Sequence, residues 1–258
     1  MKVVILAGGR GTRISEESYL KPKPMIEIGG SPILWHIMNI YSHYGFHDFI
    51  VCLGYKGNLI KEFFANYYLY MSDVSFDFND GGKMRVHKNV AQPWNVTLVD
   101  TGLDTQTGGR VKRVQKYIGD EPFMLTYGDG VSDLDLNRLV SYHNAGEALL
   151  TVTAVQPGGR FGVMDISEET GQVHGFAEKA KEDGGWINAG FMVAQPEVFD
   201  YLTGEDCIFE RGPMERLSAE GRMKAYRHNG FWQCMDTQRD KIQLEDLWQS
   251  GRAPWKLW

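Results

Sequence analysis

The sequence is poor in the features that mark membrane proteins, disulfide-linked scaffolds and nucleic-acid-binding surfaces. No apolar run reaches the roughly 20 residues that a membrane-spanning helix needs, so we expect no membrane partner. The formal net charge is −6 and no run of Lys and Arg is present, which argues against a nucleic-acid partner. Cys52, Cys207 and Cys234 are an odd number without paired metal-ligand spacing, and we interpret them as reduced thiols of a cytoplasmic protein.

The sequence also lacks the marks of a second domain. It contains no internal repeat, no low-complexity tract and no Ser- or Pro-rich linker. With 258 residues, of which 43% are hydrophobic, the chain can bury one sizeable core. We therefore expect a single domain over residues 1–258.

What the sequence does contain is an alternation of apolar strands and amphipathic helices. The first strand is a short apolar run that ends at Gly8 and Gly9, which is typical of a central parallel strand. The first helix follows Pro32, repeats apolar residues with helical spacing, and stops at Gly45. This rhythm predicts a Rossmann-like, doubly wound α/β fold. The predicted strands lie at 3–6, 49–53 and 123–126, and the predicted helices at 33–44 and 59–70.

Two regions hold more short β segments than this rhythm explains. In the first, segments 74–78, 84–87 and 96–99 are separated by a Gly-rich turn and by Pro93. This pattern suggests an antiparallel β-rich insertion over about residues 74–110. The second region runs from 149 to 193 and has Gly-rich turns. We expect a mixed sheet with a small β-rich insertion over the active site.

The C-terminal stretch, about residues 238–258, is dense in aromatic residues and contains Trp248, Trp255 and Trp258. Apolar tails of this kind pack against a partner subunit or against their own chain. The sequence leaves both alternatives open, an oligomerisation tail or a tail docked within the same subunit.

A glycine-rich turn, LAGGRGTR at residues 6–13, directly follows the first predicted strand. Glycines let a backbone approach a polyphosphate closely, and an Arg such as Arg13 can make paired hydrogen bonds to phosphate oxygens. The dinucleotide-binding pattern fails because its third glycine position falls on Ile14. The Walker pattern fails because Gly11 is followed by Thr12 and Arg13. The turn is predicted to bind phosphate, with a tight unliganded turn as the alternative.

A lysine and two aspartates complete the set of candidate functional residues. Lys23 lies between Pro22 and Pro24, which hold its backbone extended and its ammonium in place. Asp129 follows a predicted buried strand, and Asp236 precedes a predicted helix. Magnesium in phosphoryl-transfer sites is usually held by one or two carboxylates. Each Asp could instead be a turn or N-cap residue.

Taken together, these motifs resemble the sugar-1-phosphate nucleotidylyltransferases in order and spacing over nearly the whole chain. The resemblance rests on LAGGRGTR, PKP, the GDG at 128–130, Glu178-Lys179, Asn188-Ala189-Gly190 and Asp236. Within the family, EIGGSPILWHIM, TGGRVKRV, YGDGVSDLD, GFWQCMDTQRDK and GRAPWK resemble the members that use cytidine nucleotides. One departure is Ala180, because the family commonly has Pro after the Glu-Lys pair.

The resemblance implies a role for each matching residue. Arg13, Lys23 and Asp129 would be catalytic, and Asp129 and Asp236 would ligate Mg²⁺. The sugar phosphate would contact Glu178, Lys179, Asn188 and Gly190. The nucleotide would contact Leu6, Ala7, Gly8, Gly9, Arg10, Gly11, Thr12, Arg13, Lys23, Thr105, Arg110 and Gly128.

The reaction implied by the resemblance is attack of glucose 1-phosphate on the α-phosphorus of CTP, with release of pyrophosphate. Such catalysis depends on positioning and charge neutralisation rather than on a protein nucleophile. The resemblance also suggests a homo-oligomer.

Three alternatives to this reaction remain. The enzyme could use UTP, dTTP or GTP, because the sequence does not reveal base recognition. A non-catalytic sugar-nucleotide sensor could share the fold, but it would be expected to lack Lys23 or one of the two aspartates, and all three are present. A dinucleotide-dependent oxidoreductase would need the fingerprint that is missing here.

Overall fold

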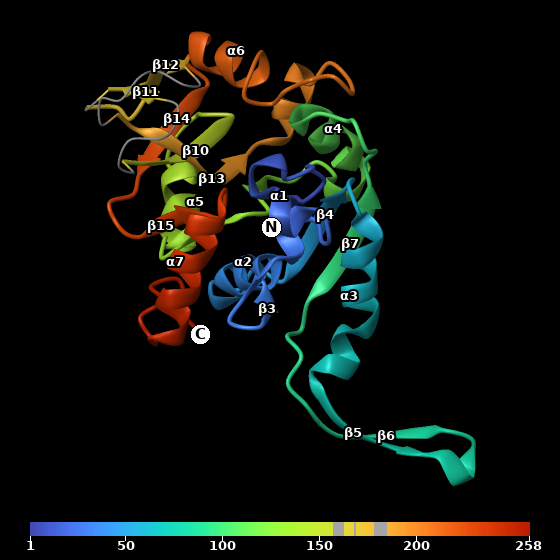
Figure 1. Ribbon diagram of the computed structural model, residues 1–258. Helices are drawn as coiled ribbons and strands as arrows, with labels where there is room; N and C mark the ends of the chain where they lie inside the picture. The colour runs from blue at the N-terminus through green and yellow to red at the C-terminus, as the bar shows by residue number, and fades with distance from the viewer. Residues whose placement is uncertain (157–162, 168, 178–184) are drawn as a thin grey trace.

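The computed structural model describes residues 1–156, 163–167, 169–177 and 185–258. Its centre is a mixed sheet whose seven described strands run in the order β14-β10-β13-β8-β1-β4-β7 (Figure 1). In chain order they are Val3–Leu6 (β1), Asp48–Leu53 (β4), Asn95–Asp100 (β7), Phe123–Tyr127 (β8), Leu150–Val155 (β10), Ile187–Ala194 (β13) and Met223–Arg227 (β14).

The parallel part of this sheet sets the position of the site. β1 lies between β4 and β8 and is parallel to both, and β7 continues the parallel arrangement beyond β4. β13 runs antiparallel to β8 and β10, which makes the sheet mixed. The carboxyl ends of β1, β4, β7 and β8 therefore meet along one edge, where α/β sheets bind ligands.

Helices cover both faces of the sheet, which confirms the predicted doubly wound α/β fold. Residues from α2, α3, α5 and α7 form one buried cluster, and residues from α4 and α6 form the other. The helices are Ser15–Ser18 (α1), Ile33–His43 (α2), Gly57–Tyr70 (α3), Thr107–Ile118 (α4), Leu136–Asn144 (α5), Pro213–Ala219 (α6) and Gln238–Gln249 (α7). No helix in these parts of the chain is both long and apolar enough to cross a membrane.

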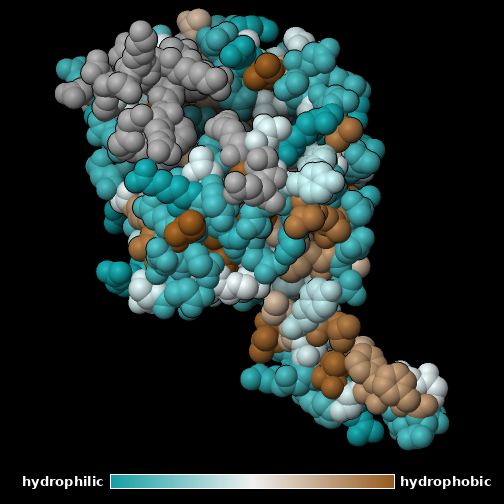
Figure 2. Space-filling model, viewed as in Figure 1, coloured by the Kyte–Doolittle hydropathy of each residue, from teal (hydrophilic) through white to brown (hydrophobic). Residues whose placement is uncertain are grey.

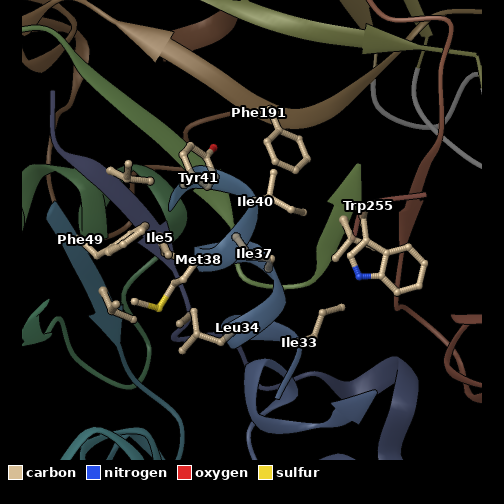
Figure 3. Packing of buried hydrophobic residues seen from close by; sticks show 14 of the residues in the cluster. Ile5, Ile33, Leu34, Ile37, Met38, Ile40, Tyr41, Phe49, Phe191 and Trp255 are labelled. Atoms are coloured by element: carbon tan, nitrogen blue, oxygen red, sulfur yellow. The ribbon is translucent and has the colours of Figure 1, made fainter. Parts of the chain in front are cut away.

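The apolar stripe read from the sequence of α2 is the stripe that packs on the sheet. Ile37 and Met38 of this helix lie in one buried cluster with Ile5 of β1 and Phe49 of β4 (Figure 3). All four side chains have no exposed surface. The helices predicted at 33–44 and 59–70 are thus confirmed as α2 and α3.

The structure differs from the prediction in the β-rich insertion expected over about residues 74–110. Ser72–Asp77 (β5) and Lys83–Asn89 (β6) form the expected antiparallel hairpin. This hairpin projects away from the body and does not cover the carboxyl edge of the sheet (Figure 1). The segment predicted at 96–99 is not part of it, because β7 pairs in parallel with β4 as the edge strand of the central sheet. A short β-rich run does not reveal its partner strand, so the sequence pattern could not separate these two outcomes.

Several two-stranded sheets and 3₁₀ turns surround the central sheet. The pair that matters for the site joins Gly130–Ser132 (β9) to Trp232–Cys234 (β15). The other strands are Glu27–Ile28 (β2), Ser31–Pro32 (β3), Val163–Ile166 (β11) and Val173–Ala177 (β12). The 3₁₀ turns are Thr12–Ile14 (η1), Lys23–Met25 (η2), Phe78–Asp80 (η3) and Pro196–Tyr201 (η4).

The C-terminal tryptophans pack within their own chain. Trp255 is 1% exposed, stacks on Phe231 with ring centroids 5.6 Å apart, and donates its indole N–H to His36 Nδ1 at 3.3 Å. Trp258 meets Trp35 edge to face at 5.7 Å. Of the two alternatives left open by the sequence, docking in the same subunit is therefore observed for this tail.

Candidate active site

A cavity of about 350 Å³ opens at the carboxyl edge of the sheet. It brings together the glycine-rich turn after β1, the lysine at η2, the start of α4, the end of β8 and the residue after Met235. Its lining residues are Leu6, Ala7, Gly8, Gly9, Gly11, Thr12, Lys23, Pro24, Thr105, Gln106, Thr107, Arg110, Tyr127, Gly128, Asp129 and Asp236. Twelve of the residues proposed from the sequence thus share one cavity: Leu6, Ala7, Gly8, Gly9, Gly11, Thr12, Lys23, Thr105, Arg110, Gly128, Asp129 and Asp236.

Lys23 is the charged centre of the cavity. Its Nζ lies 2.5 Å from Asp129 Oδ2 and 2.5 Å from Asp236 Oδ1, and its side chain is 12% exposed. Burial lowers the pKa of the Lys23 ammonium. The charges and hydrogen bonds of Asp129 and Asp236 raise this pKa by more than burial lowers it, so it lies above its ordinary value. The prediction of extended backbone at Lys23 itself is wrong, because only Pro22 is extended, while Lys23 begins the 3₁₀ turn η2 and Pro24 follows inside that turn. The ammonium is therefore charged and held in one place.

The register of one short strand pair brings the two aspartates together. Gly130 of β9 is opposite Cys234 of β15, and Met235 N–H donates to Asp129 O at 2.8 Å. Asp129 and Asp236 thus leave this pair side by side, although they are far apart in the sequence. The N-cap of α7 is Thr237, whose hydroxyl accepts from Asp240 N–H. The alternative that Asp236 is the cap residue is therefore wrong.

The glycines of the turn leave no room for side chains on its inner side. A Cβ on Gly8 would lie 2.1 Å from Arg110 Nη1, and one on Gly54 would lie 2.5 Å from Gly8 O. Gly11 has a φ of +63°, which a residue with a side chain rarely adopts. A Cβ on Gly9 would meet nothing within 4 Å. The turn is therefore packed tightly against Arg110 and Gly54 at Gly8, and it is open at Gly9.

Arg110 supports this turn from below. Its guanidinium donates to Leu53 O at 2.9 Å, to Gly102 O and Thr101 Oγ1 at 2.8 Å, and to Leu103 O at 3.2 Å. Burial, the largest influence, lowers the pKa of this side chain from its ordinary value, but an Arg stays charged in proteins. Arg110 therefore ties the ends of β4 and β7 beneath Gly8. Direct contact between Arg110 and a nucleotide stays a prediction.

The remaining sequence-based candidates lie around or beyond this cavity. Arg10 forms an exposed ion pair with Asp104 at 2.7 Å. Arg13 belongs to η1, but its side chain is not described. Asn188 and Gly190 are in β13, next to β8. Glu178 and Lys179 fall outside the described residues.

Sequence reasoning missed a hydrogen-bonded group that links two walls of the cavity. Tyr127 donates its hydroxyl to Glu210 Oε1, and Thr107 donates to Glu210 Oε2 at 2.6 Å. Asn188 Nδ2 lies 3.5 Å from the Tyr127 hydroxyl. Burial, followed by the charge of Glu210, raises the pKa of Tyr127 well above its ordinary value, so the phenol stays protonated. Tyr127 could have been noticed because it precedes GDG, whereas Glu210 is 83 positions away and has no local motif.

The two aspartates have the chemistry of a divalent-metal site. Their oxygens converge on a single cation, the Lys23 ammonium. No cluster of three or more His, Cys, Asp or Glu side chains suited to a metal occurs among the described residues. Mg²⁺ binds through one or two carboxylates and completes its shell with substrate phosphates and water. The residues present therefore fit a magnesium ion that arrives with a nucleotide.

Comparison with known proteins defines the class. A family model described as Nucleotidyl transferase matches residues 2–226. The chain belongs to the nucleotidyl transferase family, which confirms the prediction of a nucleotidyltransferase.

Individual relatives are more specific. The chain is 55% identical over 259 residues to the glucose-1-phosphate cytidylyltransferase of Salmonella typhi, with 100% of both chains covered. It is 43% identical to a probable glucose-1-phosphate cytidylyltransferase of Bacillus subtilis, again over 100% of both chains.

Solved structures support the fold alone. HddC from Yersinia pseudotuberculosis is 24% identical and superposes with a TM-score of 0.75 over 96% of this chain and 99% of the other. A UDP-glucose pyrophosphorylase complexed with UDP-glucose is 16% identical, with a TM-score of 0.76 over 97% and 99%.

Proposed function

We propose that the chain catalyses the reaction of CTP with α-D-glucose 1-phosphate to give CDP-glucose and pyrophosphate. The observation that carries this proposal is the Lys23 ammonium, held between Asp129 and Asp236 in a cavity that the glycine-rich turn also lines. The choice of CTP and glucose 1-phosphate rests on the full-length relatives that carry those substrates in their names.

In this proposal the chain's own residues bind and orient two anionic substrates. The glycine-rich turn, Arg13 and Lys23 contact the nucleotide phosphates, and Thr105, Arg110 and Gly128 complete the nucleotide site. Asn188 and Gly190, together with Glu178 and Lys179, bind the sugar phosphate. The positive charges offset the repulsion between the two substrates.

The chemical step is a single displacement. An oxygen of the sugar phosphate attacks the α-phosphorus of CTP, and the bond to the departing pyrophosphate breaks on the opposite side. The attacking phosphate is already ionised near neutral pH, so no general base is required. Lys23 stabilises the charge that develops on the phosphate oxygens. Asp129 and Asp236 would hold a Mg²⁺ ion, which would supply further positive charge to the site.

The test of this function is pyrophosphate release over a matrix of four nucleoside triphosphates and several sugar 1-phosphates. We expect CTP with glucose 1-phosphate to have the highest kcat/KM, because the full-length relatives point to that pair. Chromatography should identify CDP-glucose as the second product. If UTP or dTTP is preferred over CTP by about tenfold in kcat/KM, equal to roughly 1.4 kcal/mol, the assignment of CTP as the substrate is wrong. The assignment of the reaction as nucleotidyl transfer would still hold.

We also propose that the chain forms a homo-oligomer through the hairpin of β5 and β6. Apolar side chains gather on this projecting arm (Figure 2). Phe78 is 83% exposed and stacks on Phe76, which is 46% exposed, while Met84 is 47% exposed. A lone two-stranded hairpin is only marginally stable in water, so an arm with these side chains is expected to pack against a second copy.

Light scattering tests the assembly. The parent should have a mass above the 29.3 kDa of one chain, and the double variant Phe76→Ser, Phe78→Asp should have a lower mass because the apolar contact is lost. Ile242→Asp, at an exposed position of α7, is the control and should leave the mass unchanged. A monomeric parent, or a double variant with the parental mass, contradicts the proposal.

A further inference from the structure

Asp240 is a buried carboxylate in the first turn of α7, and it is not among the residues that line the main cavity. Its Oδ2 accepts the Thr237 N–H at 2.8 Å, and the Thr237 hydroxyl accepts the Asp240 N–H at 3.3 Å. Such a reciprocal pair is a capping box, which satisfies two backbone donors at the start of a helix. Capping alone would give Asp240 a structural role only.

The Asp240 carboxylate also makes contacts that a capping box does not need. Its Oδ2 accepts the backbone N–H of Asp236 at 3.1 Å, and its Oδ1 accepts from Gln233 Nε2 at 3.2 Å. The Thr237 hydroxyl donates to Oδ2 at 2.8 Å. Asp240 therefore contacts both ends of the segment 233–237, and this segment carries Asp236.

These contacts hold the backbone at Asp236 from two sides. The preceding N–H, that of Met235, donates to Asp129 O at 2.8 Å, while the N–H of Asp236 donates to Asp240. Because the backbone conformation limits the rotamers of a side chain, it also limits where the Asp236 carboxylate can lie. That carboxylate approaches Lys23 Nζ to 2.5 Å. A single hydrogen bond thus links Asp240 to a residue of the proposed catalytic centre.

The chemistry of these contacts calls for a carboxylate at position 240. Two backbone N–H groups, one hydroxyl and one side-chain amide donate to it, and a carboxylate only accepts. An Asn side chain has nearly the same shape but carries one acceptor oxygen and one NH₂ group. With its oxygen toward the Asp236 N–H, its NH₂ group would meet the NH₂ group of Gln233. Asp240→Asn therefore disturbs the contacts with little change in volume.

We propose that Asp240 is a positioning residue, which holds the Asp236 carboxylate in the place from which it would bind Mg²⁺ together with Asp129. This inference rests on the proposed function, because Asp240 acts only through Asp236 and touches neither substrate nor metal. Hydrogen-bonded partners of metal ligands contribute about ten- to a hundredfold to metal affinity or activity. The lower end of this range is expected, because the contact between Asp236 and Lys23 remains.

The experiment compares Asp240→Asn with Thr237→Ala in the full-length protein. Thr237→Ala removes the capping hydroxyl but leaves both backbone N–H bonds to the Asp240 carboxylate, so it is the matched control for helix capping. Each variant should melt at a slightly lower temperature than the parent, because each loses part of the capping box. Only Asp240→Asn should raise the Mg²⁺ concentration that gives half-maximal pyrophosphate release, by about tenfold.

Two further measurements separate positioning from a general loss of structure. Electron paramagnetic resonance of Mn²⁺, with CTP present and sugar phosphate absent, should show about tenfold weaker metal binding to Asp240→Asn than to the parent. Binding to Thr237→Ala should equal that to the parent. In an Asp236→Asn background, adding Asp240→Asn should change kcat by less than about twofold, because residues that act through one group are not additive.

Parental Mg²⁺ dependence and Mn²⁺ binding in a folded Asp240→Asn variant would overturn the proposal. The same defect in Thr237→Ala would also overturn it, since Asp240 would then be only part of a helix cap. So would an equal loss of kcat in the parental and Asp236→Asn backgrounds.

A variant that does not fold is replaced by a milder one. Asp240→Glu keeps the carboxylate but moves it by one methylene group, and it is expected to show the same weaker Mn²⁺ binding, whereas parental binding would contradict the proposal. Failure of the proposed function is distinguishable, because the parent would then release no pyrophosphate from CTP with glucose 1-phosphate.

Discussion

Replacing Lys23 by Ala is expected to lower kcat roughly a hundredfold, because one preorganised charge contributes on the order of 3 kcal/mol to the transition state. The effect on KM for CTP should be much smaller. The ammonium lies 2.5 Å from each of two carboxylates, and the Lys23 side chain is 12% exposed. Neither water nor another side chain can therefore easily take the place of this charge in the variant. The loss should therefore appear in turnover more than in binding.

The neighbouring lysine provides the matched control for this variant. Lys21 is in the same PKP-containing segment, but its side chain is 46% exposed and pairs with Glu27. Lys21→Ala should leave kcat within about threefold of the parent, because exposed ion pairs contribute little. Steady-state kinetics of both variants make the comparison. If Lys23→Ala also stays within about threefold, Lys23 has no part in the mechanism.

Replacing Asp129 or Asp236 by Asn is expected to reduce activity steeply and to make it depend on higher Mg²⁺. Asn keeps nearly the shape of Asp and one ligand oxygen, but it lacks the negative charge that holds the metal. Added Mg²⁺ should therefore recover part of the activity in both variants. The fold should survive, since the β9–β15 pair that presents these residues uses backbone hydrogen bonds.

The measurement is a Mg²⁺ titration of pyrophosphate release, combined with thermal melting of each variant. Asp120→Asn, at an exposed position before β8, is the control and should titrate like the parent. An Asp129 or Asp236 variant with parental activity at low Mg²⁺ would remove that residue from the metal site. The same titration separates an enzyme from a non-catalytic sensor, because a sensor would release no pyrophosphate at any Mg²⁺ concentration.

Strands β1, β4 and β8 of the central sheet could be predicted because they are buried along almost their whole length. Val3–Leu6 is apolar at every position and ends in glycines, and such a run has few alternatives to a central parallel strand. The apolar residues of α2 repeat with helical spacing, so this helix was equally predictable. The edge strand β7 is half-buried along its middle and exposed at both ends, and nothing in its sequence distinguishes pairing with β4 from pairing in the hairpin.

The site was predictable only in part, for a related reason. The glycine-rich turn and Lys23 are marked locally by glycines and prolines, so their chemistry is visible in the sequence. The approach of Asp129 to Asp236 depends on β9 and β15, each only three residues long, which is too short for a periodic signal. Glu210 meets Tyr127 across 83 positions, and the carbonyl contacts of Arg110 come from two separate segments, at Leu53 and at Gly102 and Leu103. Such contacts exist only in the folded chain.

The most direct test of the central claim, a single displacement at the α-phosphorus within this cavity, is the stereochemistry of that phosphorus. The substrate is CTP with a chiral α-phosphorothioate, and the configuration of the CDP-glucose analogue formed from glucose 1-phosphate is determined by phosphorus NMR. One in-line attack by the sugar phosphate inverts the configuration. Inversion is therefore the predicted result. Retention would mean two successive displacements through a nucleotidyl–enzyme intermediate, and it would contradict a mechanism in which Lys23, the glycine-rich turn and the two aspartates only position substrates and neutralise charge.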